Sequence, residues 1–80
     1  MQVTIQLFAV LKEDLGSTIT MEVPSGTTVG QLRQQFVTTY PKFQPAAKSL
    51  SVAVNLEYAT DAVVIEEGQE VAIFPPVSGG

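Results

Sequence analysis

The chain has 80 residues and neither Cys nor His, so it can form one small hydrophobic core but no disulfide and no common structural zinc site. It also lacks the residues most often used as general base and strong nucleophile, and a self-sufficient enzyme is therefore not expected. The net charge of −4, with four basic residues in all, argues against a nucleic-acid partner and against an anionic membrane surface.

The first 24 residues predict two strands joined through a short helical turn. Apolar and polar side chains alternate along residues 1–8 and again along residues 19–23, which is typical of half-buried strands. The residues expected to face inward are Val3, Ile5, Leu7, Ile19, Met21 and Val23. Residues 9–15 are expected to form the helical turn and to end it at Gly16.

Residues 28–40 predict the main helix. Thr28, followed by Gln31 three positions later, is typical of a capping box at a helix N-terminus. Pro41 is expected to end the helix, because the residue before a proline is disfavoured in the helical region. The apolar stripe predicted to face the core comprises Val29, Leu32, Phe36, Val37 and Tyr40, with Arg33, Gln34 and Gln35 covering the other side.

The second half of the chain predicts shorter elements. A connector over residues 42–49 precedes a third strand at 50–54, which turns at Asn55 toward Tyr58. Residues 62–65 are expected to form a brief strand or a 3₁₀ turn, and residues 71–74 the final strand. The element order is β-β-α-β-(β)-β, which indicates an α+β fold with a mixed sheet and one main helix packed on one of its faces.

Two aromatic residues, Phe8 and Phe74, alternate with the residues expected to face inward in their strands, so their side chains should point to the other face of the sheet. They are therefore expected on the open face of the sheet, near Ala53. A loop could cover them, and single exposed apolar residues need no explanation. Two aromatic rings on one open face would instead form an apolar patch of the kind that marks a docking site for a partner.

The last six residues, 75–80, predict an extended tail. Pro75 and Pro76 cannot donate to a sheet ladder and favour an extended conformation, so they end the last strand. Six extended residues span about 20 Å. Gly79 and Gly80 carry no Cβ, so the tip could pass a narrow channel and expose its terminal carbonyl.

The chain resembles the small subunit of molybdopterin synthase, called MoaD, within the ubiquitin-like sulfur carriers. The most specific part of the resemblance is the segment 70–80, Glu-Val-Ala-Ile-Phe-Pro-Pro-Val-Ser-Gly-Gly. Weaker similarities are Leu7-Phe8-Ala9, Leu11-Lys12-Glu13, Gly16, Val54-Asn55 and Asp61. In relatives the turn at Gly68 commonly reads Asp-Gly-Asp-Glu, and a His-Pro often follows the equivalent of Asp61; here those positions hold Glu67-Gly68-Gln69-Glu70 and Ala62-Val63.

The resemblance implies a β-grasp domain over residues 1–74 and a working tail over residues 75–80. It implies that an E1-like activating enzyme uses ATP to adenylate the Gly80 carboxylate, which then becomes a thiocarboxylate. The tail, made of Pro75, Pro76, Val77, Ser78 and Gly79, would insert into the large synthase subunit. There the thiocarboxylate would donate sulfur to cyclic pyranopterin monophosphate and so form molybdopterin. Phe8 and Phe74 remain the residues expected, from their strand phase, to dock a partner. No bound cofactor or metal is expected, and the assembly would be a heterotetramer.

Three other functions remain open. A sulfur carrier for thiamine synthesis or tRNA thiolation would share the fold and the Gly-Gly tip, although the Pro-Pro-Val-Ser segment favours the molybdopterin branch. A protein modifier would be joined through Gly80 to lysines of other proteins. An interaction domain would not use its tail. Residues 1–4 show no signal-peptide pattern and no apolar run approaches about 20 residues, so a cytoplasmic location is expected.

Overall fold

A computed structural model describes residues 1–76 of the chain. The expectations for Val77, Ser78, Gly79 and Gly80 lie outside the described residues. Pro75 is half-buried and Pro76 is exposed, directly after the last strand ends at Phe74.

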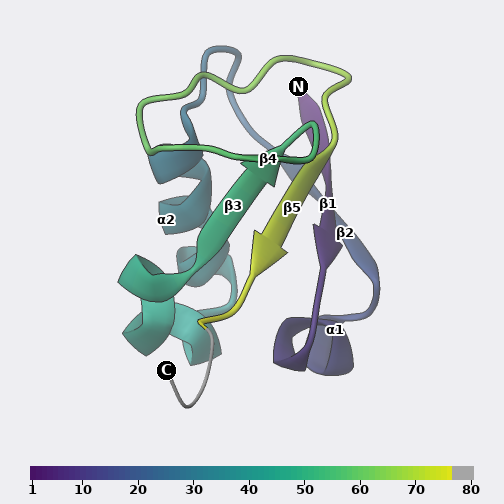
Figure 1. Ribbon diagram of the computed structural model, residues 1–80, viewed down its shortest axis with the longest axis vertical. Coiled ribbons are helices and arrows are strands. Elements are labelled where there is room, and N and C mark those ends of the chain that lie inside the picture. The colour runs from purple at the N-terminus through teal and green to yellow at the C-terminus, as the bar shows by residue number, and fades with distance from the viewer. Residues whose placement is uncertain (77–80) are drawn as a thin grey trace.

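Five strands form one mixed sheet with a helix packed on one face (Figure 1). In chain order the elements are β1 (Gln2–Leu7), α1 (Val10–Leu15), β2 (Thr18–Glu22), α2 (Val29–Thr39), η1 (Pro41–Ser49), β3 (Ser51–Val54), β4 (Glu57–Tyr58) and β5 (Val71–Phe74). The strand order is β2-β1-β5-β3-β4, with β1 and β5 parallel and the other pairs antiparallel. The predicted β-grasp fold is therefore confirmed.

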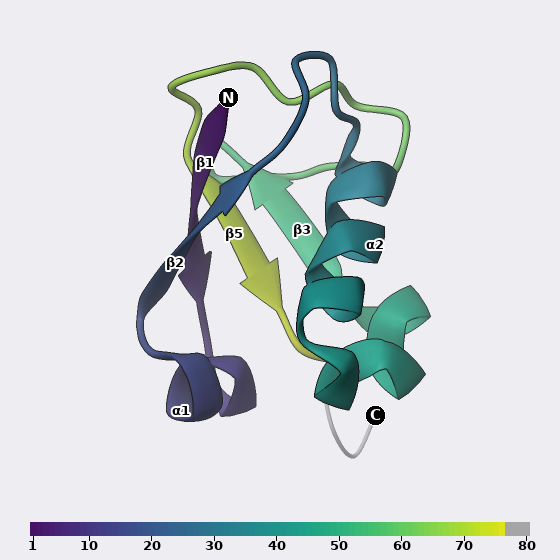
Figure 2. The ribbon, with the colours of Figure 1, turned by 180° about the vertical axis from the view of Figure 1, so that it is seen from behind.

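In both ribbon views α2 lies against one face of the sheet (Figures 1 and 2), and the buried hydrophobic residues of the sheet and of α2 form one core. The alternation in β1 is confirmed, because Val3, Ile5 and Leu7 are buried while the residues between them are exposed. From the central strand β5, Val71 and Ile73 enter the same core. The residues that alternate with these therefore face away from α2 and form the open face of the sheet.

The capping box of α2 is confirmed. The Thr28 side chain accepts a hydrogen bond from the Gln31 backbone N–H, and the Gln31 side chain accepts one from the Thr28 N–H. The predicted apolar stripe is also confirmed, with Phe36 fully buried and Tyr40 half-buried. The helix ends at Thr39, before Pro41, as the sequence predicts.

The expectation that Arg33 covers the solvent side of α2 is wrong. Its side chain is only 14% exposed: Nε donates to the Leu50 carbonyl, and Nη1 pairs with Asp61 at 2.6 Å. Gly30 lies one turn away, where a Cβ would come within 3.1 Å of the Asp61 side chain. Long-range contacts that no local pattern reveals therefore hold the 59–65 segment against the helix.

Two expectations about the second half need correction. The segment expected as a connector over residues 42–49 is a 3₁₀ helix, η1, anchored by the buried Phe43, whose ring stacks 5.9 Å from Phe36. The fourth strand is β4, where a turn was expected, whereas residues 62–65 form only an isolated bridge, Thr28 to Val64. Backbone bonds to the start of α2 replace sheet pairing there, because the Val29 N–H donates to the Val63 carbonyl.

Candidate docking face

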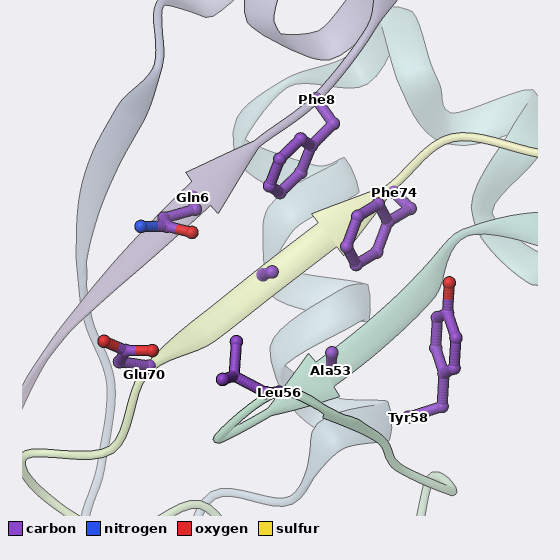
Figure 3. Close-up of a pocket in the computed structure, with 8 residues that line it drawn as sticks. Gln6, Phe8, Ala53, Leu56, Tyr58, Glu70 and Phe74 are labelled. Carbon is purple, nitrogen blue, oxygen red and sulfur yellow. The ribbon is translucent and has the colours of Figure 1, made fainter.

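The open face of the sheet carries a shallow apolar hollow of about 180 Å³. Its floor follows from the strand register, which places Ala72 of β5 beside Gln6 on one side and beside Ala53 on the other. Tyr58 pairs with Ala53 and continues the row onto β4. Two alanines therefore leave a gap in the middle of the sheet, between longer side chains at both ends of the row (Figure 3).

Three aromatic rings form the wall of this hollow nearest the end of β5. The Phe8 and Phe74 rings are stacked, with their centroids 4.6 Å apart, and the Tyr58 ring is tilted against Phe74 at 5.8 Å. Phe8 remains 38% exposed and Tyr58 76% exposed. The prediction that Phe8 and Phe74 lie together on the open face, near Ala53, is confirmed; that the face docks a partner stays a prediction.

Sequence reasoning missed two residues of this face, Leu56 and Tyr58. Tyr58 was assigned to a turn, so its strand phase was not considered. Leu56 belongs to the two-residue loop between β3 and β4, where the paired residues are Val54 and Glu57. The sequence does contain a signal for this loop. The dipeptide Asn55-Leu56 precedes Glu57, and Asn at the first position of a two-residue loop is typical of a tight hairpin turn.

The loop that carries Leu56 is strained. Asn55 and Leu56 have φ of 50° and 69°, the left-handed conformation that a type I′ turn requires at both positions. Asn tolerates this region, whereas for a side chain such as Leu it costs about 1–2 kcal/mol. The Leu56 side chain is also 88% exposed, so it gains almost nothing by burial within its own domain.

Glu70 lies at the end of the hollow opposite the stacked rings (Figure 3). Its backbone N–H donates to the Asn55 side chain, which links the loop to the start of β5. Within residues 1–76 the ion pairs are Met1–Glu22, Arg33–Asp61 and Lys42–Asp14. The Glu70 carboxylate therefore has no cationic partner in the described part of the chain, and it gives one end of an apolar hollow a free negative charge.

The stacked rings lie directly before the tail. Phe74 is the last residue of β5, and β5 ends at the same end of the molecule as α1 and η1 (Figure 1). The turn between β3 and β4 and the loop that leads into β5 lie at the opposite end of the sheet (Figures 1 and 2). The hollow thus begins at the point where the chain leaves the domain.

Residues 5–80 match the sequence profile of the ThiS family. The chain belongs to this family. It is 34% identical to the molybdopterin synthase sulfur carrier subunit of Chlamydomonas reinhardtii, over 100% of both chains. It is 32% identical to the protein of that name from Arabidopsis thaliana, over 99% of this chain and 83% of the relative. The predicted resemblance to MoaD and the ubiquitin-like sulfur carriers is confirmed.

A solved structure of the same fold is SAMP1, a small archaeal modifier protein from Haloferax volcanii. It is 31% identical to this chain, covers 100% of both chains and superposes with a TM-score of 0.78. Proteins similar to this chain thus carry two kinds of name, sulfur carrier and protein modifier.

Neither a membrane span nor a metal cluster is found in the described part of the chain. No helix between residues 1 and 76 combines the length and apolar character needed to cross a bilayer. The same residues contain no group of three or more Asp or Glu side chains arranged to hold a metal ion.

Proposed function

We propose that this chain is the sulfur carrier subunit of a molybdopterin synthase. The observation that carries the proposal is its similarity, over nearly its whole length, to two proteins named molybdopterin synthase sulfur carrier subunit. The match to the ThiS family extends through Gly80, so the Gly-Gly tip belongs to the matched region. The absence of Cys and His from the sequence fits a role in which partner enzymes supply the catalytic side chains.

The chemistry begins at the Gly80 carboxylate. An E1-like enzyme would join it to the AMP part of ATP and release pyrophosphate, which turns a poor leaving oxygen into a good one. Sulfur at the oxidation level of sulfide would then attack the acyl carbon and displace AMP, which leaves a thiocarboxylate. In the large synthase subunit the sulfur of this group would bond to a carbon of the pyranopterin precursor, and water would then hydrolyse the resulting thioester, so that the sulfur stays on the precursor and Gly80 returns to a carboxylate. A cytoplasmic location and a heterotetrameric synthase remain predictions.

Intact-mass measurement tests this proposal. The protein is purified from its own cells, with and without the activating enzyme. A fraction of the protein should gain the mass expected for replacing one oxygen atom by sulfur, and that fraction should vanish without the activating enzyme. A protein that never gains sulfur, in cells that make molybdopterin, would refute the proposal.

A protein modifier is the second candidate, and the similarity to SAMP1 favours it. Both candidates start from an activated Gly80, but the modifier's carbonyl would be attacked by a lysine amine of another protein. A tagged chain expressed in its own cells distinguishes them. Covalent conjugates of higher mass on a denaturing blot support the modifier, whereas free chain carrying sulfur supports the carrier.

The stacked rings give a prediction about docking. Phe8→Ser and Phe74→Ser should each weaken binding to the large synthase subunit by more than tenfold, because truncating an aromatic hot-spot residue commonly costs about 2 kcal/mol or more of binding, and about 1.4 kcal/mol corresponds to tenfold. The unfolding free energy should fall by only about 1–2 kcal/mol, since a fully buried Phe costs about 3–5 kcal/mol. Calorimetric titration and thermal unfolding measure the two effects. A large loss of stability with intact binding would mean that the rings serve the fold.

Gly79 gives a prediction about passage into the partner site. Gly79→Ala should reduce sulfur transfer mildly and Gly79→Val severely, because Val adds a branched side chain beside the reacting carbonyl and stiffens the backbone. Each variant is loaded chemically with sulfur, and product formation is measured in a single turnover. Affinity for the large subunit should stay unchanged. If Gly79→Val reacts as fast as the parent, the small tip is not needed for passage.

A further inference from the structure

We infer that Leu56 is a partner-binding anchor and that Glu70 beside it selects a basic residue of the partner. The inference rests on the proposed function and specifies the partner surface that this face accepts. The occupant is the large synthase subunit, which would present an aliphatic side chain to the hollow and an Arg or Lys to its Glu70 end.

The first argument is that Leu56 fits its own domain poorly. Its backbone lies at φ 69°, in a turn position that favours Gly or Asn, and its side chain is 88% exposed. The turn already has Asn55 at its first position, so Asn-Gly would build the same loop without strain. Local strain that the fold does not need is commonly found at functional sites. Leu56 lines the hollow, where its side chain adds apolar surface opposite the stacked rings (Figure 3).

The second argument concerns the size and charge of the hollow. A buried apolar cavity of about 150 Å³ can hold a benzene molecule, so the roughly 180 Å³ here has room for one apolar side chain of a partner. Its sides are Phe8, Phe74, Tyr58 and Leu56, whereas the Glu70 carboxylate at one end forms no ion pair within residues 1–76. An aliphatic side chain with a neighbouring cation complements both features, and a charge pair of this kind would fix the orientation of docking.

The third argument narrows the occupant of the hollow to a protein that receives the tail. Gly80 is six residues beyond Phe74, and six residues span at most about 20 Å. A protein that binds Gly80 in its active site must therefore have surface within that distance of Phe74. Since Phe74 is itself a wall of the hollow, a protein that receives the tail is placed to fill it. Of the two proteins that act on Gly80 in the proposed function, the inference assigns the hollow to the large synthase subunit.

The test uses the full-length chain and the large synthase subunit of the same organism. Leu56→Asn suits the turn and removes the apolar side chain, so its melting temperature should equal or exceed that of the parent while its Kd rises more than tenfold. The control is Val64→Thr, which changes another exposed apolar residue, outside the hollow, and should leave the Kd unchanged. A lower melting temperature with unchanged Kd would show that Leu56 serves the fold and would overturn the inference.

The charge is tested by Glu70→Gln, with Glu67→Gln as the matched control from the same loop that does not line the hollow. Glu70→Gln should raise the Kd about threefold to tenfold and flatten its dependence on salt between low and physiological ionic strength. Equal effects of the two variants would overturn the role of Glu70.

A homodimer is the alternative occupant. If the parent forms a homodimer in solution and Leu56→Asn dissociates it, a second copy of the chain fills the hollow and the inference is wrong.

The two proposals can fail separately. If the parent gains sulfur and binds the large subunit, but the Leu56 and Glu70 variants bind equally well, this inference fails while the proposed function stands. If the parent neither gains sulfur nor binds the large subunit, the proposed function fails and the inference falls with it.

Discussion

Removal of Gly80 is expected to abolish adenylate formation and sulfur transfer while leaving thermal unfolding nearly unchanged. The reacting carboxylate would then belong to Gly79, one residue short of its place in the active site of the activating enzyme, and misplacement on the ångström scale can cost two orders of magnitude in rate. Stability should hold because every buried hydrophobic residue of the described chain lies between Val3 and Ile73.

The measurement is ATP–pyrophosphate exchange with the activating enzyme, beside a melting curve of the same preparation. A suitable control is Ser78→Ala, which keeps the length of the tail and should retain most of the exchange. Persistent sulfur loading of the shortened chain would show that the carboxylate of Gly80 is not the working group.

Phe36→Ala is expected to have the largest effect on the fold itself. Phe36 is fully buried beneath the sheet, and its ring contacts Tyr40 at 5.2 Å and Phe43 at 5.9 Å between centroids. Truncation of a buried Phe costs about 3–5 kcal/mol, which is a large share of the roughly 5–15 kcal/mol that stabilises a small domain. The melting temperature should fall by more than about 10 °C.

Chemical denaturation measures the loss, and Thr38→Ala is the control because Thr38 lies exposed on the same helix. The loss should include partial release of η1, since Phe43 of that element packs on Phe36. A loss below about 1 kcal/mol would mean that Phe36 does not hold α2 and η1 to the core.

Periodicity and local chemistry in the sequence were sufficient for much of the architecture. The alternation of Val3, Ile5 and Leu7 determines which face of β1 is buried, because side chains in a strand point to opposite faces in turn. The pair Thr28 and Gln31 determines where α2 begins, since both capping bonds join residues three positions apart. The same alternation placed Phe8 and Phe74 on the open face, half of the candidate docking site.

Only the tertiary structure revealed the other half. Tyr58 joins the hollow because its strand pairs with β3, and Leu56 joins it because the tight turn forces a left-handed backbone. Arg33 is covered because two segments distant in sequence, at Leu50 and Asp61, meet its side chain. Residues 62–65 bond to the start of α2 instead of entering the sheet. These features depend on contacts between residues far apart in the chain, whereas sequence patterns report the period and caps of one element at a time.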